Sequence, residues 1–217
     1  MLLVHSSLLS FVLLNIATPL DTATTDQEFT RLFDGKTLSG WEGDQKLFRV
    51  VNGAIVAGSL QQPIARNEFL CTRKTFENFE LRLQARLRGK GNNAGIQFRS
   101  RRIPNNHEVI GYQCDMGSTS ELKNIWGWLY DESRRGTFLA RPAAKNTARP
   151  FKPNDWNELR IRCQGQRIQI WLNGVQTIDY TEQDKQISRR GVIGLQIHGG
   201  AASEASYKDI RIKELNP

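Results

Sequence analysis

Polar side chains at every second position mark three short stretches between Gly95 and Gly136 and a fourth stretch near the end of the chain. Alternate side chains of a β-strand point to opposite faces, so each stretch would present one apolar face and one polar face. Amides, carboxylates, an imidazole and aromatic rings gathered on one sheet would suit a polyhydroxylated ligand. The candidate residues are Gln97, Arg99, Gln113, Asp115, Trp126, Trp128, Glu132, Gln196 and His198.

Three of these residues are candidates for proton transfer. His198 is the leading candidate for a general base, because the charge of histidine ordinarily changes near neutral pH; a hydrogen-bonded structural histidine is the alternative. Asp115 and Glu132 are candidates for an acid, a base or a metal ligand, and Asp131 is an alternative to its neighbour Glu132. Each carboxylate has a simpler interpretation as the partner of a nearby arginine.

The other candidates would bind the ligand. Gln97, Gln113 and Gln196 are suited to hydrogen bonds with sugar hydroxyls. Trp126 and Trp128 are suited to stacking on a sugar face, although core packing is the alternative for both and the better interpretation for at least one of them.

Strand alternation and turn signals continue along the rest of the chain. Residues 79–87 alternate most regularly, and the Asn52-Gly53 and Asn173-Gly174 steps predict two-residue hairpin turns. Residues 137–153 carry three prolines without periodicity, which predicts a long loop at the rim of the polar face. Many short strands and no convincing amphipathic helix predict an all-β fold, an antiparallel jelly-roll β-sandwich.

The N-terminal residues are expected to lie outside this fold. Residues 8–20 form an apolar run of signal-peptide length, too short to span a bilayer, although no lysine or arginine precedes it. We therefore expect a signal peptide or disordered N-terminus at 1–25, a single jelly-roll domain at 28–217, and export to the periplasm or the cell exterior. No other segment is long and apolar enough to form a stable membrane span.

Charge and cysteine content limit the remaining interpretations. A net charge of +8 is compatible with nucleic acid or an anionic surface as a partner, but the basic residues are scattered and no nucleic-acid-binding motif is present. A solvated basic surface without a nucleic-acid partner is the expectation. Cys71, Cys114 and Cys163 are far apart and form no CxxC motif, which favours buried free thiols. An exported chain could still form one disulfide.

Seven motifs of the sequence stand in the order seen in the 3-keto-disaccharide hydrolase domain family, so the chain resembles that family. The resemblance covers residues 29–215 and implies a concanavalin A-like jelly roll, usually in exported bacterial proteins. It also implies cleavage of glycosides that are already oxidised at carbon 3, and therefore a sugar oxidoreductase as a functional partner. The motifs occupy residues 32–41, 51–56, 95–100, 111–115, 156–160, 171–174 and 191–198.

The implied chemistry differs from ordinary glycoside hydrolysis. A ketone at carbon 3 acidifies the proton on carbon 2, so a base can form an enolate that expels the group on carbon 1, and water then adds. Such a site needs a base, an acid and a positive group for the enolate, but not the usual carboxylate pair. Arg99 is one candidate for the positive group. A divalent cation held by aspartate, glutamate and histidine is another.

A non-catalytic carbohydrate-binding module is the alternative function, because jelly rolls host both enzymes and binding modules. An enzyme requires His198, Asp115 and Glu132 to converge in one pocket, whereas a binding module does not.

Overall fold

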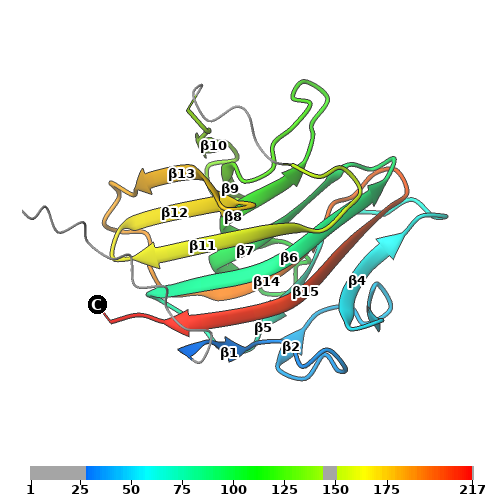
Figure 1. Cartoon of the computed structure of the whole chain (residues 1–217), viewed down its shortest axis with the longest axis horizontal. Coiled ribbons are helices and arrows are strands. Elements are labelled where there is room, and N and C mark those ends of the chain that lie inside the picture. Colours follow the sequence, from blue (N-terminus) through cyan, green and yellow to red (C-terminus); the bar gives the residue numbers. More distant parts are fainter. Residues whose placement is uncertain (1–27, 144–150, 217) are drawn as a thin grey trace, which may run out of the picture.

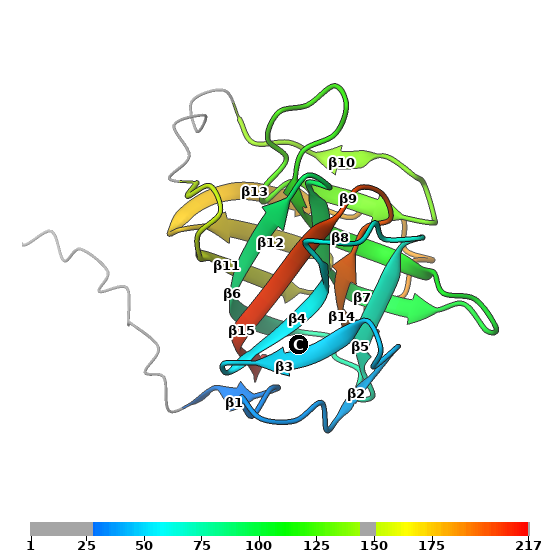
Figure 2. The same cartoon turned by 90° about the vertical axis from the view of Figure 1, so that its right-hand side faces the viewer.

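The computed structural model describes residues 28–143 and 151–216, which form two antiparallel β-sheets packed face to face (Figures 1 and 2). These residues contain no α-helix, which confirms the prediction of an all-β jelly roll. A helix able to cross a membrane is likewise absent from both ranges. The predicted signal segment, residues 1–25, lies outside the described residues, as does part of the predicted loop at 137–153.

Sheet A contains eight strands of the described chain. Their bounds are β1 (Thr30–Arg31), β3 (Phe48–Val51), β4 (Ala54–Ser59), β6 (Phe79–Gly89), β11 (Asn157–Gln164), β12 (Arg167–Leu172), β13 (Val175–Thr181) and β15 (Ser203–Glu214). The order across the sheet is β13-β12-β11-β6-β15-β4-β3, and β1 pairs with the far end of β15.

Sheet B contains seven strands of the described chain and packs behind sheet A in Figure 1. Its strands are β2 (Trp41–Glu42), β5 (Glu68–Thr72), β7 (Asn93–Arg102), β8 (Val109–Gly117), β9 (Leu129–Glu132), β10 (Phe138–Ala140) and β14 (Val192–Ile197). The order across the sheet is β10-β9-β8-β7-β14-β5-β2, so β7, β8 and β14 are neighbours.

The apolar faces of the alternating strands meet between the two sheets. Leu81 and Leu83 of β6 are buried in the same core as Ile96 and Phe98 of β7. Burial of such side chains is the main favourable contribution to folding, about 1.5–3 kcal/mol for each. This core fixes which side chains of each strand face outward.

The two predicted asparagine-glycine turns are confirmed. Asn52 and Gly53 have φ angles of 49° and 75°, and Asn173 and Gly174 have φ angles of 46° and 81°. Two consecutive positive φ angles define the type I′ turn, which matches the twist of the strands that it joins. These turns fix the registers of the β3–β4 and β12–β13 hairpins.

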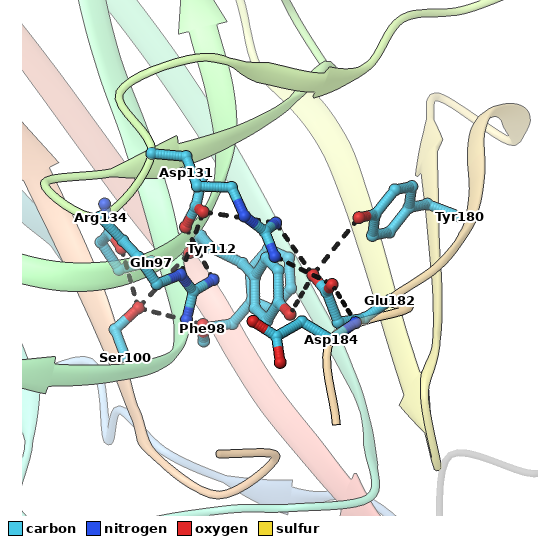
Figure 3. A network of polar contacts seen from close by, with 10 residues as sticks. Gln97, Phe98, Ser100, Tyr112, Asp131, Arg134, Tyr180, Glu182 and Asp184 are labelled. Atoms are coloured by element: carbon cyan, nitrogen blue, oxygen red, sulfur yellow. Dashed lines mark hydrogen bonds and ion pairs between the residues drawn. The ribbon is translucent and has the colours of Figure 1, made fainter. Parts of the chain in front are cut away.

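A buried ionic cluster ties the two sheets together at one end of the sandwich (Figure 3). Glu182, next to β13, accepts hydrogen bonds from the Tyr112 hydroxyl at 2.8 Å and from Arg135 at 2.9 and 3.0 Å. Asp131, which is fully buried, pairs with Arg134 at 2.7 Å and with Arg135 at 3.5 Å. Because Tyr112 and Asp131 belong to sheet B, the cluster joins it to the edge of sheet A.

The electrostatics of this cluster favour the ionised form of Glu182. Burial alone would raise the pKa of its carboxyl group. Hydrogen bonds from Arg135, from the backbone N–H of Asp184 and from Tyr112 outweigh burial and hold the pKa at about 2. Glu182 is therefore ionised across the whole physiological pH range.

The three cysteines are free and buried, as predicted from their positions. Burial raises the pKa of Cys71 to about 11 and that of Cys163 to about 12. Burial also raises the pKa of Cys114. These thiols remain protonated and pack as small apolar side chains.

Candidate active site on the outer face of sheet B

The predicted polar residues of β7, β8 and β14 lie side by side on the outer face of sheet B. Gly95 stands opposite Asp115 of β8 and opposite Gln196 of β14, and Gln97 stands opposite Gln113. Directly opposite residues of antiparallel strands share a face. Gln97, Gln113, Asp115 and Gln196 therefore point to the same side of the sheet, as the alternation predicts.

A chain of hydrogen bonds runs through these side chains to Asp115. The Ser100 hydroxyl donates to Gln97 Oε1 at 2.8 Å, and Gln97 Nε2 donates to Gln113 Oε1 at 2.7 Å. Gln113 Nε2 then donates to Asp115 Oδ1 at 2.5 Å. Gly95 makes room for this arrangement, because a Cβ atom there would lie 2.5 Å from Gln113 Cδ. This chain of hydrogen bonds fixes the orientation of the Asp115 carboxyl group.

Glu132, rather than Asp131, joins this face. Glu132 stands opposite Gly111 of β8, so it lies on the same side as Gln113, and Gln196 Nε2 donates to Glu132 Oε2 at 3.2 Å. Asp131 points to the other side of β9, into the ionic cluster of Figure 3. The choice that alternation left open between the two neighbours is settled by their partners.

Asp115, Glu132 and His198 line one cleft with a volume of about 460 Å³. The lining includes residues 119–122, which follow β8, and Gly136, Thr137, Phe138 and Arg141. These three candidate residues therefore share one cleft. The remaining lining residues are Asn93, Gln113, Ile125 and Tyr130.

The environment of the cleft raises the pKa of both carboxyl groups. Burial raises the pKa of Asp115 well above its ordinary value, and the negative charge of Glu132 adds to the rise. Burial and the negative charges of Glu108 and Asp131 raise the pKa of Glu132 to about 7. The site thus favours the neutral form of Asp115, while Glu132 populates both forms near neutral pH.

His198 has its ring orientation set by a backbone carbonyl. The half-buried imidazole donates from Nδ1 to the Gly199 carbonyl oxygen at 2.6 Å. Because Nδ1 carries the proton in this arrangement, Nε2 of the neutral ring has a free lone pair. His198 can therefore accept a proton at Nε2.

The prediction that Arg99 shares the face of Gln97 is wrong. A β-bulge between Phe98 and Arg101 interrupts the alternation of β7, and Arg99 has a left-handed backbone with φ of 48°. Its side chain is buried and donates to the carbonyl oxygens of Glu77 and Gly165, each at 2.8 Å. Arg99 is a structural residue away from the cleft.

The prediction that Trp126 lines the polar face is also wrong. The chain turns between Ile125 and Trp128 with Gly127 at φ of 71°, so strict alternation begins only at β9. Trp126 consequently packs in the core against Phe151, with 5.2 Å between ring centroids. Trp128 is also buried, in edge-on contact with Phe138, and does not line the cleft.

The candidate residues chosen from the sequence did not include Arg141, Tyr130 and Phe138, which line the cleft. The guanidinium carbon of Arg141 lies 5.2 Å from the ring centroid of Trp128 and 5.5 Å from that of Phe138, which holds a positive charge at the cleft wall. Phe138 belongs to β10, a strand within the segment predicted to be a loop. Only Tyr130 had a signal in the sequence, because it alternates with Glu132.

The described residues do not fit the metal alternative. Across residues 28–143 and 151–216, no group of three or more His, Cys, Asp or Glu side chains is arranged to hold a metal ion. The positive group at the cleft is Arg141.

A jelly-roll sandwich with a cleft lined by carboxyl groups and aromatic rings suits a carbohydrate-related protein. The model of the 3-keto-alpha-glucoside-1,2-lyase-like domain matches residues 28–213, so the chain belongs to that family. This result confirms the resemblance seen in the sequence motifs. A comparison with curated proteins finds no match.

Solved structures with the same fold include two candidate glycosyl hydrolases of Parabacteroides distasonis. One is 18% identical with a TM-score of 0.66, covering 88% of this chain and 95% of its own. The other is 22% identical with a TM-score of 0.61, covering 86% and 99%. A carbohydrate-binding module of Bacillus subtilis is 14% identical with a TM-score of 0.58, covering 81% and 96%. These likenesses establish the fold, whereas the catalytic roles of Asp115, Glu132 and His198 stay predictions.

Proposed function

We propose that the protein hydrolyses 3-keto-glycosides in the cleft of Asp115, Glu132 and His198, by elimination followed by hydration. The observation that carries the proposal is the meeting of two carboxyl groups of raised pKa with an imidazole whose Nε2 is free to accept a proton. Membership of the 3-keto-alpha-glucoside-1,2-lyase-like family supports the substrate class.

In the first step, His198 Nε2 removes the proton from carbon 2 of the oxidised sugar. The electron pair of the broken C–H bond moves onto carbon 2 and the carbon 3 ketone, which forms an enolate. The neutral carboxyl group of Asp115 donates a hydrogen bond to the enolate oxygen, a role that a carboxyl group can fill only if it keeps its proton. Arg141 adds a positive charge at the cleft wall.

In the second step, the enolate re-forms the ketone and expels the oxygen on carbon 1, which takes the proton of Glu132. Water then attacks carbon 1 of the unsaturated sugar and gives a proton to the Glu132 carboxylate. His198 returns its proton to carbon 2. The products are a 3-keto sugar and the released alcohol, and Glu132 suits both roles because its pKa is about 7.

The buried amides act by positioning rather than by touching the sugar. Gln97 and Gln196 are fully buried and lie beneath the cleft surface, where they support Gln113 and Glu132. Tyr130 and Phe138, which line the cleft, are the rings available to flank a bound sugar.

The deciding experiment compares a 3-keto-disaccharide with its unoxidised parent, using purified protein in D₂O. We expect cleavage of the oxidised substrate only, with deuterium incorporated at carbon 2. Turnover of both sugars at similar rates would reject the elimination mechanism. Binding of either sugar without turnover would favour the second candidate, a carbohydrate-binding module, which the likeness to the Bacillus subtilis module supports.

We also infer that the protein is exported and that a sugar oxidoreductase supplies its substrate. The apolar run at residues 8–20 supports export. The requirement for a carbon 3 ketone supports an oxidising partner. N-terminal sequencing of protein recovered from cells tests export, because an intact Met1 in cytoplasmic material would contradict it.

A further inference from the structure

A row of four arginines crosses four strands of sheet A and ends beside a tryptophan on a fifth strand. Trp171 of β12 stands opposite Arg160 of β11, which stands opposite Arg82 of β6. Arg82 in turn stands opposite Arg211 of β15, which stands opposite Arg31 of β1. Figure 1 shows these strands side by side in the front layer. We call Arg31, Arg82, Arg160 and Arg211 the arginine row.

The arginine row faces away from the core. The neighbours of Arg82 and Arg160 along their strands, such as Leu81 and Ile161, are fully buried between the sheets, so the arginines point outward. Like charges directly opposite each other destabilise a sheet. The row contains three such pairs in succession, so four like charges gather on one surface.

Aromatic rings support the guanidinium groups of the row. The Arg160 guanidinium carbon lies 3.7 Å from the ring centroid of Trp171. Those of Arg82 and Arg211 lie 4.5 Å and 6.0 Å from the ring centroid of Phe29. A guanidinium group on a ring still offers N–H groups at its edge, and these match the planar geometry of a carboxylate.

A cleft of about 340 Å³ opens beside the row and is lined by Phe29, Arg31, Arg82 and Arg211, together with Glu158 and Asp209. Glu80, two residues along β6, pairs with Arg82 at 2.6 Å. The basic surface continues along β6 and β15, where Arg86 and Lys208 lie 4.6 Å and 4.3 Å from the ring centroid of Trp156.

We propose that this face binds an acidic polysaccharide, a chain of uronic acids. Neighbouring strands are about 4.8 Å apart, which is close to the length of one sugar along such a chain, so successive arginines can meet successive carboxylates. The surface lies on the sheet opposite the candidate active site. The proposal goes beyond the proposed function and does not rest on it.

Two other anionic partners, single-stranded nucleic acid and an anionic membrane, fit the surface less well. Single-stranded nucleic acid is held by stacking its bases on free aromatic rings, but cations cover the rings of Trp171, Phe29 and Trp156. Binding to an anionic membrane strengthens with the apolar area that inserts, but the exposed large hydrophobic residues of the described chain are Val51 and Leu60, which are outside the arginine row.

The test measures binding of polygalacturonate by the full chain at low salt and at physiological salt. The matched neutral probe is the same polymer with its carboxylates methyl-esterified. The row variant is Arg31→Gln with Arg160→Gln. The control variant, Arg73→Gln with Arg190→Gln, removes the same charge at exposed residues flanking sheet B strands.

We expect polygalacturonate to bind, the ester not to bind, and salt to weaken the affinity. The row variant should lose about fivefold in affinity per arginine, whereas the control variant should change by less than twofold. Equal losses in the two variants, or no binding to polygalacturonate, would overturn the proposal. Tighter binding of oligothymidylate would assign the face to nucleic acid instead, and tighter binding of phosphatidylserine vesicles would assign it to a membrane.

Discussion

Gln113 and Asp115 stand two residues apart on β8 and are joined by a hydrogen bond of 2.5 Å from the amide Nε2 to the carboxyl Oδ1. Because Oδ1 accepts the amide proton, Oδ2 is the oxygen left to carry a proton when the carboxyl group is neutral. This one contact links the buried amides of sheet B to the chemistry proposed in the cleft. The first four predictions concern this site.

Asp115→Asn should change the pH dependence of stability. The folded protein raises the pKa of Asp115, so this group stabilises the fold below its unfolded pKa of about 3.9, and that contribution is lost as the pH rises through the folded pKa. Each pKa unit corresponds to about 1.4 kcal/mol. Denaturant unfolding at a series of pH values should show the wild type losing more stability than the variant between acidic and neutral pH. Parallel curves would contradict the raised pKa.

Glu132→Gln should abolish the alkaline limb of the rate profile. The acid role of Glu132 in leaving-group departure needs its protonated form, so kcat/KM should fall as the pH rises through about 7. Glu108→Gln is the sharper companion variant, because loss of this negative charge lowers the pKa of Glu132 and moves the limb to lower pH. If the alkaline limb does not move in Glu108→Gln, a group other than Glu132 causes it.

His198→Ala should remove most turnover of a 3-keto-glycoside, by about 10²–10⁴-fold, because general-base catalysis contributes that much. The half-buried imidazole contributes little to the core, so the unfolding midpoint should change little. Exchange of the carbon 2 proton with D₂O should be lost together with turnover. Retained exchange in this variant would transfer the base role to Glu132.

Gly95→Ala should displace the Gln113 side chain and with it the Asp115 carboxyl group. The new methyl group would lie 2.5 Å from Gln113 Cδ, and such overpacking costs about 1–3 kcal/mol of stability. Misplacement of a catalytic group by 1 Å lowers turnover by about 100-fold. Because Gln113→Ala removes the clashing atoms, the double variant should be more stable than the sum of the single effects predicts. Strictly additive losses would contradict the clash.

Glu182→Gln should weaken the link between the two sheets. The folded pKa of about 2, compared with an ordinary 4.5, means that Glu182 stabilises the fold above pH 4.5 and that its contribution is lost as the pH falls towards 2. The loss at neutral pH should be about 3 kcal/mol, measured by denaturant unfolding. The control is Asp179→Asn, which breaks an exposed pair with Arg167 and should cost less than about 1 kcal/mol.

Much of the fold follows from local pattern. Alternation predicts which side chains of β6 and β8 face the core, and the Asn52-Gly53 and Asn173-Gly174 steps predict their turns. The face shared by Gln97, Gln113, Asp115 and Gln196 follows from the same alternation, because a slip by one residue would bury charged groups.

The misplaced site residues share a physical cause, which is the loss of alternation. The bulge at Arg99 and the turn at Gly127 each break the period of two, and neither has a strong local signal in the sequence. Arg141 follows a strand that was not predicted. The arginine row was not predicted for a different reason: alternation turns each arginine outward, but only the register between distant strands aligns Arg82 with Arg160 and Arg211.

The pairing of β1 with β15 brings Thr30 opposite Ile212. During synthesis, β1 therefore cannot pair with β15 until almost the whole sandwich has been made. Contacts so distant in sequence close slowly, because the chain loses loop entropy before it gains the contact. Completion of sheet A is thus a late event in folding. Because Arg31 and Arg211 meet at this same pair of strands, the arginine row is assembled only in the finished protein.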